Sequence, residues 1–179
     1  MKNILAGLDL EILSAEDAGV IEDVAEDQDT FAGNALKKAR FVAEKTGEWA
    51  VADDSGICID ALAGAPGVFS ARWSEGAPLA EFTLQKMTGI KDRSAQFFSC
   101  AALATPDGQS WTFEGKIAGH LLEQCRGIAH PKLPYDVIFV PQGSDKTFAE
   151  MNDEEKNSLS HRGEAFRQLR EFLLNKRDK

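Results

Sequence analysis

The spacing of apolar residues along the chain predicts two amphipathic helices. In residues 30–46, small and apolar side chains return every three or four positions, Thr30 stands where a helix cap is expected, and Gly47 is a typical stop. In residues 160–176 the same spacing brings one apolar face together. This face consists of Ala165, Phe166, Leu169, Phe172 and Leu173. A shorter helix is expected at residues 78–88.

Short apolar or alternating segments predict the strands of a sheet. Two of them, residues 4–5 and 8–13, lie at the start of the chain, and a third, residues 49–53, ends in the carboxylates of Asp53 and Asp54. The others are residues 95–104 and 110–118, which predict a hairpin around the turn at 106–108, and Tyr135–Val140.

Residues 63–76 are rich in Gly, Ala, Ser and Pro and predict a loop. Helices and strands alternate in the first part of the chain, and a hairpin follows. The fold class that we expect is therefore α/β with a mixed sheet, in a single domain over residues 1–179.

Composition narrows the class of protein. With 179 residues, of which 43% are hydrophobic, the chain can bury the core of one domain. The net charge of −9 argues against a general binder of nucleic acid or of anionic membranes. The charge is uneven, because residues 1–36 carry nine acids and one base, Lys2, whereas residues 146–179 carry eight bases. One local basic cluster is enough to bind a phosphate ligand.

The cysteines and the longest apolar runs bear on the compartment. Cys58, Cys100 and Cys125 are odd in number and lack C-x-x-C spacing, which predicts buried or half-buried free thiols rather than catalytic ones. No apolar run approaches the roughly 18 residues that span a bilayer. The start of the chain is not a signal peptide. We therefore predict a cytoplasmic protein without a membrane segment.

The segment Ala52-Asp53-Asp54-Ser55-Gly56 is the first candidate for chemistry. Two adjacent carboxylates at a strand end repel each other unless a cation or strong donors neutralise them. Oxygen ligands of this kind suit Mg²⁺, which commonly takes one or two carboxylates together with substrate phosphates. The alternative interpretation is an acidic turn in which Asp caps the backbone and Ser-Gly are turn residues.

The second candidate is Lys156 followed by Ser160-His161-Arg162-Gly163. Ser160 can cap the last helix, so that His161 and Arg162 lie in its first turn. Cations there oppose the helix dipole, and a bound phosphate or polar base would account for them. A solvated basic helix start is the alternative interpretation.

These segments together resemble a known family. The stretch ADDSGICIDALAGAPGVFSARW at 52–73 is similar to the signature of the inosine/xanthosine triphosphate pyrophosphatases, and residues 30–47, 135–139 and 145–169 resemble that family in the same order. The resemblance implies an elongated α/β fold with a central sheet, flanking helices and two lobes around a central cleft. It also implies a homodimer that hydrolyses ITP, dITP and XTP to the monophosphate and pyrophosphate with Mg²⁺.

The resemblance also implies a role for individual residues. Asp54 would be the general base and a metal ligand, and Asp53 would support it as a second metal ligand. Lys156 would meet phosphate or base, while His161 and Arg162 would read the 6-oxo edge of the purine. The other substrate contacts that it implies are Ser55, Tyr135, Asp136 and Ser160.

The sequence departs from the family pattern in three places. Family members carry a T/S-G-N-x-x-K loop that grips the triphosphate, whereas here MKNILA runs directly into GLDLEIL, and Lys2 and Asn3 do not replace that loop. Leu133 and Pro134 stand where the family has a base-stacking aromatic residue and a glycine. Gly33 stands where a metal-binding Glu is frequent.

These departures leave two alternatives to the hydrolase. One is a nucleotide-binding or dimer-partner protein that kept the fold without catalysis. The other is a pyrophosphatase for a different modified nucleotide.

Overall fold

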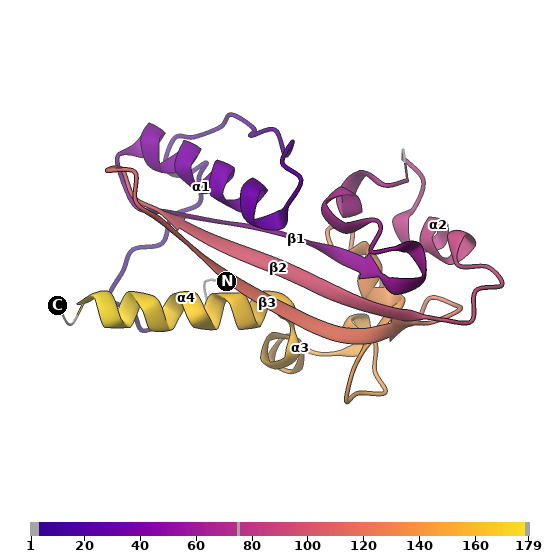
Figure 1. Ribbon diagram of the computed structural model, residues 1–179. Helices are drawn as coiled ribbons and strands as arrows, with labels where there is room; N and C mark the ends of the chain where they lie inside the picture. Colours follow the sequence, from indigo (N-terminus) through magenta and orange to yellow (C-terminus); the bar gives the residue numbers. More distant parts are fainter. Residues whose placement is uncertain (1–3, 75, 178–179) are drawn as a thin grey trace. The chain divides into compact units, whose positions relative to one another are not determined.

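The computed structural model describes residues 4–74 and 76–177 (Figure 1). The chain divides into two compact units, in agreement with the two lobes that we expected. Unit 1 comprises Met1–Asp54, Ser99–Gly115 and Arg162–Lys179, and unit 2 comprises Ser55–Phe98 and Lys116–His161. Each unit is described by itself below.

Four strands form one sheet in the order β1-β2-β3-β4. Their bounds are Ala50–Ile59 for β1, Ser94–Ala104 for β2, Ser110–Leu121 for β3 and Phe139–Pro141 for β4. The predicted hairpin is confirmed, since β2 and β3 are joined by a turn in which the Gly108 N–H donates to the Thr105 carbonyl at 3.0 Å. Strand β3 pairs antiparallel with β4. The α/β class is confirmed. In the described part of the chain, no parallel pairing of strands is described.

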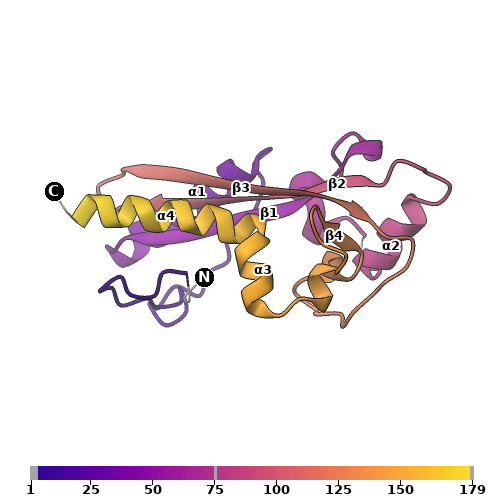
Figure 2. The same ribbon diagram turned by 90° about the horizontal axis from the view of Figure 1, so that it is seen from below.

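In unit 1, helices α1 (Phe31–Thr46) and α4 (His161–Arg177) cover opposite faces of the sheet (Figure 1, Figure 2). Both predicted helices are confirmed. The Thr30 hydroxyl caps α1 by accepting the Gly33 N–H at 3.0 Å, and Gly47 ends the helix with a left-handed φ of 72°. Alanines form the buried face of α1, which lets its backbone lie close to the sheet. They are Ala35, Ala39 and Ala43.

The apolar face of α4 packs into a core that belongs to unit 1. This core unites residues from the start of the chain, from β2 and from α4. Its buried members are Leu5, Leu8, Ala101, Leu103, Ala165, Phe166, Leu169 and Leu173.

The two strands predicted at residues 4–5 and 8–13 are wrong, because residues 4–29 contain no helix or strand. Gly7 has a φ of 80°, and the Leu8 N–H turns back to the Leu5 carbonyl. Leu5 and Leu8 therefore bury their side chains against α4 from a turn and not from a sheet. Lys2 and Asn3 lie outside the described residues.

Unit 2 has a separate core that is rich in aromatic rings. It includes Ile57, Ile59, Met87, Phe97, Leu121, Tyr135, Ile138, Phe139 and Phe148. The predicted helix at 78–88 is confirmed as α2 (Leu79–Lys86). Helix α3 (Asp153–Leu159) was not predicted, although Asn152 and Glu155 form a reciprocal capping box at its start.

Two further predictions in unit 2 need correction. The first half of residues 135–140 belongs to a 3₁₀ turn, η3 (Pro134–Val137), because Pro134 fixes the backbone for a helical first position. Only Phe139–Pro141 is extended, and the continuous burial of the segment gave it the pattern of a strand. The predicted loop at 63–76 contains the 3₁₀ helix η2 (Gly67–Arg72). None of the helices in the described residues is long and apolar enough to cross a membrane.

Candidate functional site

Asp53 and Asp54 lie within strand β1 and not at its end. The prediction that the strand ends in these carboxylates is wrong, because Ser55 and Gly56 continue it up to Ile59. Successive side chains of a strand point to opposite faces. Accordingly Asp53 contacts α4 and Asp54 contacts α1, so mutual repulsion of the two carboxylates is relieved by separate partners.

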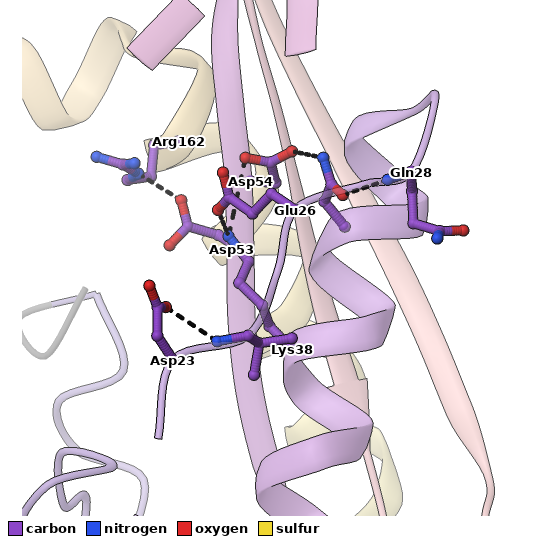
Figure 3. A network of polar contacts seen from close by, with 9 residues as sticks. Asp23, Glu26, Gln28, Lys38, Asp53, Asp54 and Arg162 are labelled. Atoms are coloured by element: carbon purple, nitrogen blue, oxygen red, sulfur yellow. Dashed lines mark hydrogen bonds and ion pairs between the residues drawn. The ribbon is translucent and has the colours of Figure 1, made fainter. Parts of the chain in front are cut away.

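Asp54 is held by an amide from helix α1 (Figure 3). The residue is 8% exposed, and its Oδ2 accepts a hydrogen bond of 2.9 Å from Asn34 Nδ2. Asn34, which is 1% exposed, uses its Oδ1 to accept the Gln28 backbone N–H at 3.0 Å. The bond from Gln28 therefore determines which end of the amide faces Asp54.

Lys38 lies one helical turn after Asn34, on the same side of α1. Its Nζ is 2.7 Å from Glu26 Oε1 and 3.8 Å from Asp54 Oδ1 (Figure 3). A single ammonium group thus faces two carboxylates, with Glu26 the nearer.

Asp53 pairs with the first turn of α4. Arg162 Nε donates to Asp53 Oδ2 at 2.8 Å. The cation predicted at this helix start is therefore present, and its partner in the protein is a carboxylate. The carboxylates of Glu26 and Asp54 thus lie near the Lys38 ammonium, and the carboxylate of Asp53 lies near the Arg162 guanidinium.

The donor chemistry around Asp54 fits Mg²⁺. In the described part of the chain, no group of three or more His, Cys, Asp or Glu side chains is arranged to hold a metal ion. Magnesium commonly needs only one or two protein carboxylates when substrate phosphates complete its coordination. Asp54, with Glu26 on the same side of β1, matches that limited requirement.

A second cluster of predicted residues lies in unit 2. The Lys156 ammonium forms an ion pair with the buried Asp136 carboxylate and lies 5.5 Å from the centre of the Phe148 ring. Lys156 belongs to α3 and Asp136 to η3, so the structure joins two segments that the sequence analysis had linked only through the resemblance.

His161 is buried and stacked on Phe97. The two ring centres are 4.7 Å apart, and the planes are nearly parallel, at 6°. Ser160, which is also buried, precedes His161 in extended backbone between α3 and α4. The stack holds the imidazole plane in one orientation, as recognition of a purine edge would require.

Tyr135 and Ser55 are two further residues that were predicted to contact the substrate. Tyr135 is buried, and its hydroxyl donates to the Ser70 carbonyl at 2.7 Å. Burial raises the pKa of the Tyr135 phenol, which therefore stays neutral as a donor. Ser55 is half-buried on β1, directly after Asp54.

The sequence analysis did not identify the residues that contact the predicted site residues and hold them in place. These are Glu26, Gln28, Asn34, Lys38 and Phe97. For Asn34 a signal existed, because a polar side chain next to the alanine face of α1 is buried and must find partners. For Phe97 no signal distinguished the ring that stacks on His161 from the other aromatic residues of the chain.

The thiols do not contribute to either cluster. Burial raises the pKa of Cys100 to about 11 and also raises the pKa of Cys58 and Cys125, which disfavours the reactive thiolate. All three are free, as predicted. Cys125 is exposed, however, which corrects the expectation that every thiol is at least half-buried. His120 and His130 are exposed.

Comparison with known proteins identifies a matching family and similar proteins. A profile of the Ham1 family matches residues 1–172. The "dITP/XTP pyrophosphatase" of Streptomyces coelicolor is 45% identical over 170 residues, which cover 92% of this chain and 84% of the relative. The protein of the same name from Zymomonas mobilis is 44% identical over 177 residues, with coverage of 94% and 83%.

Solved structures are similar over most of the chain. The Ham1 protein of Staphylococcus aureus has a TM-score of 0.87 and 31% identity, and covers 98% of this chain and 91% of its own. The HAM1 protein of Coxiella burnetii has a TM-score of 0.88 and 34% identity, with coverage of 97% and 91%.

Proposed function

The chain belongs to the Ham1 family, and from this membership we propose that it hydrolyses non-standard purine nucleoside triphosphates. The substrates are dITP, XTP and ITP, and the products are the monophosphate and pyrophosphate. The similarity to proteins named dITP/XTP pyrophosphatase supports the substrate class. The observation that carries the proposal is the buried Asp54 carboxylate, which Asn34 holds by a hydrogen bond and which lies 3.8 Å from the Lys38 ammonium.

Asp54 acts as the general base. Its carboxylate, oriented by the Asn34 amide that donates to Oδ2, takes a proton from water. The water oxygen then forms a bond to the α-phosphorus, while the bond from that phosphorus to the bridging oxygen of the β-phosphate breaks. Pyrophosphate leaves with the electron pair of the broken bond.

Mg²⁺ would be held by Asp54 and by phosphate oxygens, and when bound it lowers the negative charge of the triphosphate. Asp53 remains a predicted ligand, and its ion pair with Arg162 supports a second role, in orienting that guanidinium. Adding Mg²⁺ alone in calorimetry tests whether wild type binds the ion more tightly than Asp54→Asn.

The residues of unit 2 provide the recognition of the base. Lys156 and Asp136 offer a donor and an acceptor, and His161 offers an imidazole in a defined plane. Arg162, which belongs to unit 1, is proposed as a donor to phosphate or to the 6-oxo group. Ser55, Tyr135 and Ser160 remain predicted contacts of the substrate.

Pyrophosphate release from dITP, XTP, ITP and the four standard triphosphates tests the proposal. We expect turnover of the first three, and a loss in Asp54→Asn of at least about 100-fold in kcat, the usual contribution of a general base. Asp92→Asn is the matched control, because Asp92 is an exposed carboxylate that binds the Ser94 N–H. Absence of turnover in wild type, or equal rates in wild type and Asp54→Asn, would contradict the proposal.

The homodimer is a separate part of the proposal. Sedimentation equilibrium should give twice the mass of the 19.5 kDa chain at micromolar concentration. A monomer at every concentration would exclude it.

A further inference from the structure

Phe148 borders two of the groups that we propose for recognition of the base. It is the first residue of the 3₁₀ helix η4 (Phe148–Glu150) and is 2% exposed. The Lys156 ammonium lies over its ring, 5.5 Å from the ring centre, and the centre of the His161 ring is 6.5 Å away, with 38° between the planes. One buried aromatic side chain therefore contacts the cation and lies next to the imidazole.

The backbone around η4 fixes the place of this ring. Thr147 is fully buried, and its N–H donates to Glu150 Oε2 at 2.8 Å. The same carboxylate oxygen accepts from Arg126 Nε at 2.8 Å, and the Thr147 hydroxyl donates to the Arg126 carbonyl at 3.0 Å. Because these bonds hold the residues on both sides of Phe148, its ring cannot follow a lysine that moves.

Lys156 lies between this ring and a carboxylate. Its ammonium forms an ion pair with Asp136, and the two side chains are only 20% and 10% exposed. A cation that is largely out of water gains more from the face of an aromatic ring than an exposed cation does. The ion pair attracts the ammonium to Asp136, and the ring limits the direction from which it arrives. Without the ring, the flexible stem of a lysine side chain can reach the same carboxylate in several rotamers.

We propose that Phe148 is a positioning residue that keeps the Lys156 ammonium in one place, ready to contact the substrate. Phe148 acts through Lys156 and does not itself touch the substrate. The inference rests on the proposed function, since it takes Lys156 as a group that binds the nucleotide. A donor whose position is already fixed strengthens binding, because its side-chain freedom is lost before the substrate arrives. Loss of the ring should therefore raise KM and leave the step performed by Asp54 unchanged.

Phe148→Leu tests the role of the ring, because leucine is apolar but has no aromatic face. We expect KM for dITP to rise about five- to thirtyfold, the factor that corresponds to a desolvated cation–π contact, with kcat within about threefold of wild type.

Phe139→Leu is the matched control for Phe148→Leu. Phe139 is a fully buried ring of the same core, and its centre is 5.3 Å from that of Phe148, whereas the Lys156 ammonium lies over Phe148. The control should lose similar stability but keep KM within about twofold of wild type. Equal increases of KM in the two variants would show a merely structural role and overturn the inference.

A double-mutant cycle shows whether Phe148 acts through the lysine. Lys156→Met keeps the length of the side chain and removes its charge. In this background Phe148→Leu should change KM by less than about twofold, because no ammonium remains to be positioned. The same increase of KM with and without the lysine would overturn the inference.

A spectroscopic readout makes the test independent of turnover. Protons over the face of an aromatic ring resonate upfield, so in wild type the ε-methylene protons of Lys156 should lie upfield of those of the exposed Lys91. The Lys156 signal is assigned by its loss in Lys156→Met. It should move to the position of the Lys91 signal in Phe148→Leu and stay upfield in Phe139→Leu. A wild-type Lys156 signal at the position of Lys91 would overturn the inference whether or not the variants fold.

The two proposals fail in different ways. If wild type hydrolyses no nucleotide, the proposed function is wrong, and the Lys156 signal still decides whether Phe148 positions the lysine. If wild type is active and Phe148→Leu matches it in both KM and the Lys156 signal, only the role of Phe148 is wrong.

Discussion

The carboxylate region of unit 1 and the aromatic region of unit 2 are organised by different forces. The first consists of Glu26, Gln28, Asn34, Lys38 and Asp54, and hydrogen bonds and charges hold it together. The second consists of Phe97, Asp136, Phe148, Lys156 and His161, and in it aromatic rings pack on one another beside the ion pair of Lys156 and Asp136.

This difference predicts which substitutions each region tolerates. Hydrogen bonds specify direction, so the carboxylate region should be sensitive to changes that keep volume but remove a donor or a charge. Ring packing depends on volume and contact, so the aromatic region should be sensitive to truncation. The first region suits activation of a water molecule, and the second suits selection of a flat base.

The largest expected effect on stability is that of Phe97→Ala. Phe97 contacts His161, Phe139 and Phe148, and its truncation should lower the free energy of unfolding by about 3–5 kcal/mol. Preference for dITP over standard triphosphates should fall as well, because the imidazole loses its support. Thermal denaturation and the ratio of kcat/KM values measure the two effects.

Phe166→Ala is the control for Phe97, because Phe166 is fully buried in the core of unit 1. It should show a similar loss of stability with unchanged preference. Phe97→Leu, which retains most of the volume, keeps the test decisive if the alanine variant does not fold. Unchanged preference in Phe97→Leu would contradict the role of the stack.

A smaller loss of stability is expected for Asn34→Ala. The variant removes the donor to Asp54 and leaves the Gln28 N–H without its acceptor, at a cost of about 1–3 kcal/mol. Because Asp54 then loses its orientation, kcat should fall about tenfold or more. Denaturant unfolding and steady-state kinetics give the two quantities.

Thr30→Ala is the matched control for Asn34. It removes the cap of the same helix, at a cost of about 1 kcal/mol, without touching Asp54. If both variants lowered kcat equally, the effect of Asn34 would reflect the stability of α1 and not the orientation of the carboxylate.

The smallest expected effects concern the chemical reactivity of the three cysteine thiols, which reports how readily each part of the structure opens. In the native protein an Ellman reagent should modify the exposed Cys125 first, Cys58 more slowly, and Cys100 only after opening of unit 1. With a pKa of about 11, Cys100 holds only about a thousandth of its thiol as thiolate at pH 8, and this fraction rises about tenfold per pH unit below the pKa.

Labelling in increasing denaturant compares the two units, because Cys100 lies in unit 1 and Cys58 in unit 2. Separate midpoints for Cys58 and Cys100 would show that the regions open independently. A common midpoint would show one cooperative unit. Modification of Cys100 in the native state at the rate of Cys125 would contradict its burial.

Local signals in the sequence were sufficient for the helices and the hairpin. Thr30 and Gly47 bound α1 because capping depends on a few neighbouring residues, and the turn at 106–108 needs only its own backbone. The motifs around Asp54 and His161 were visible for the same reason, since each is contiguous in the chain.

Tertiary structure alone decided how these residues are supported. The pairs Asn34–Asp54 and Arg162–Asp53 join residues 20 and 109 positions apart, and no local period encodes such distances. The start of the chain shows the same limit, because Leu8 packs on α4 from a turn, whereas Leu10 of the same alternating pattern is exposed. A sequence pattern records that a side chain is buried, whereas its partner depends on which surfaces the folded chain brings together.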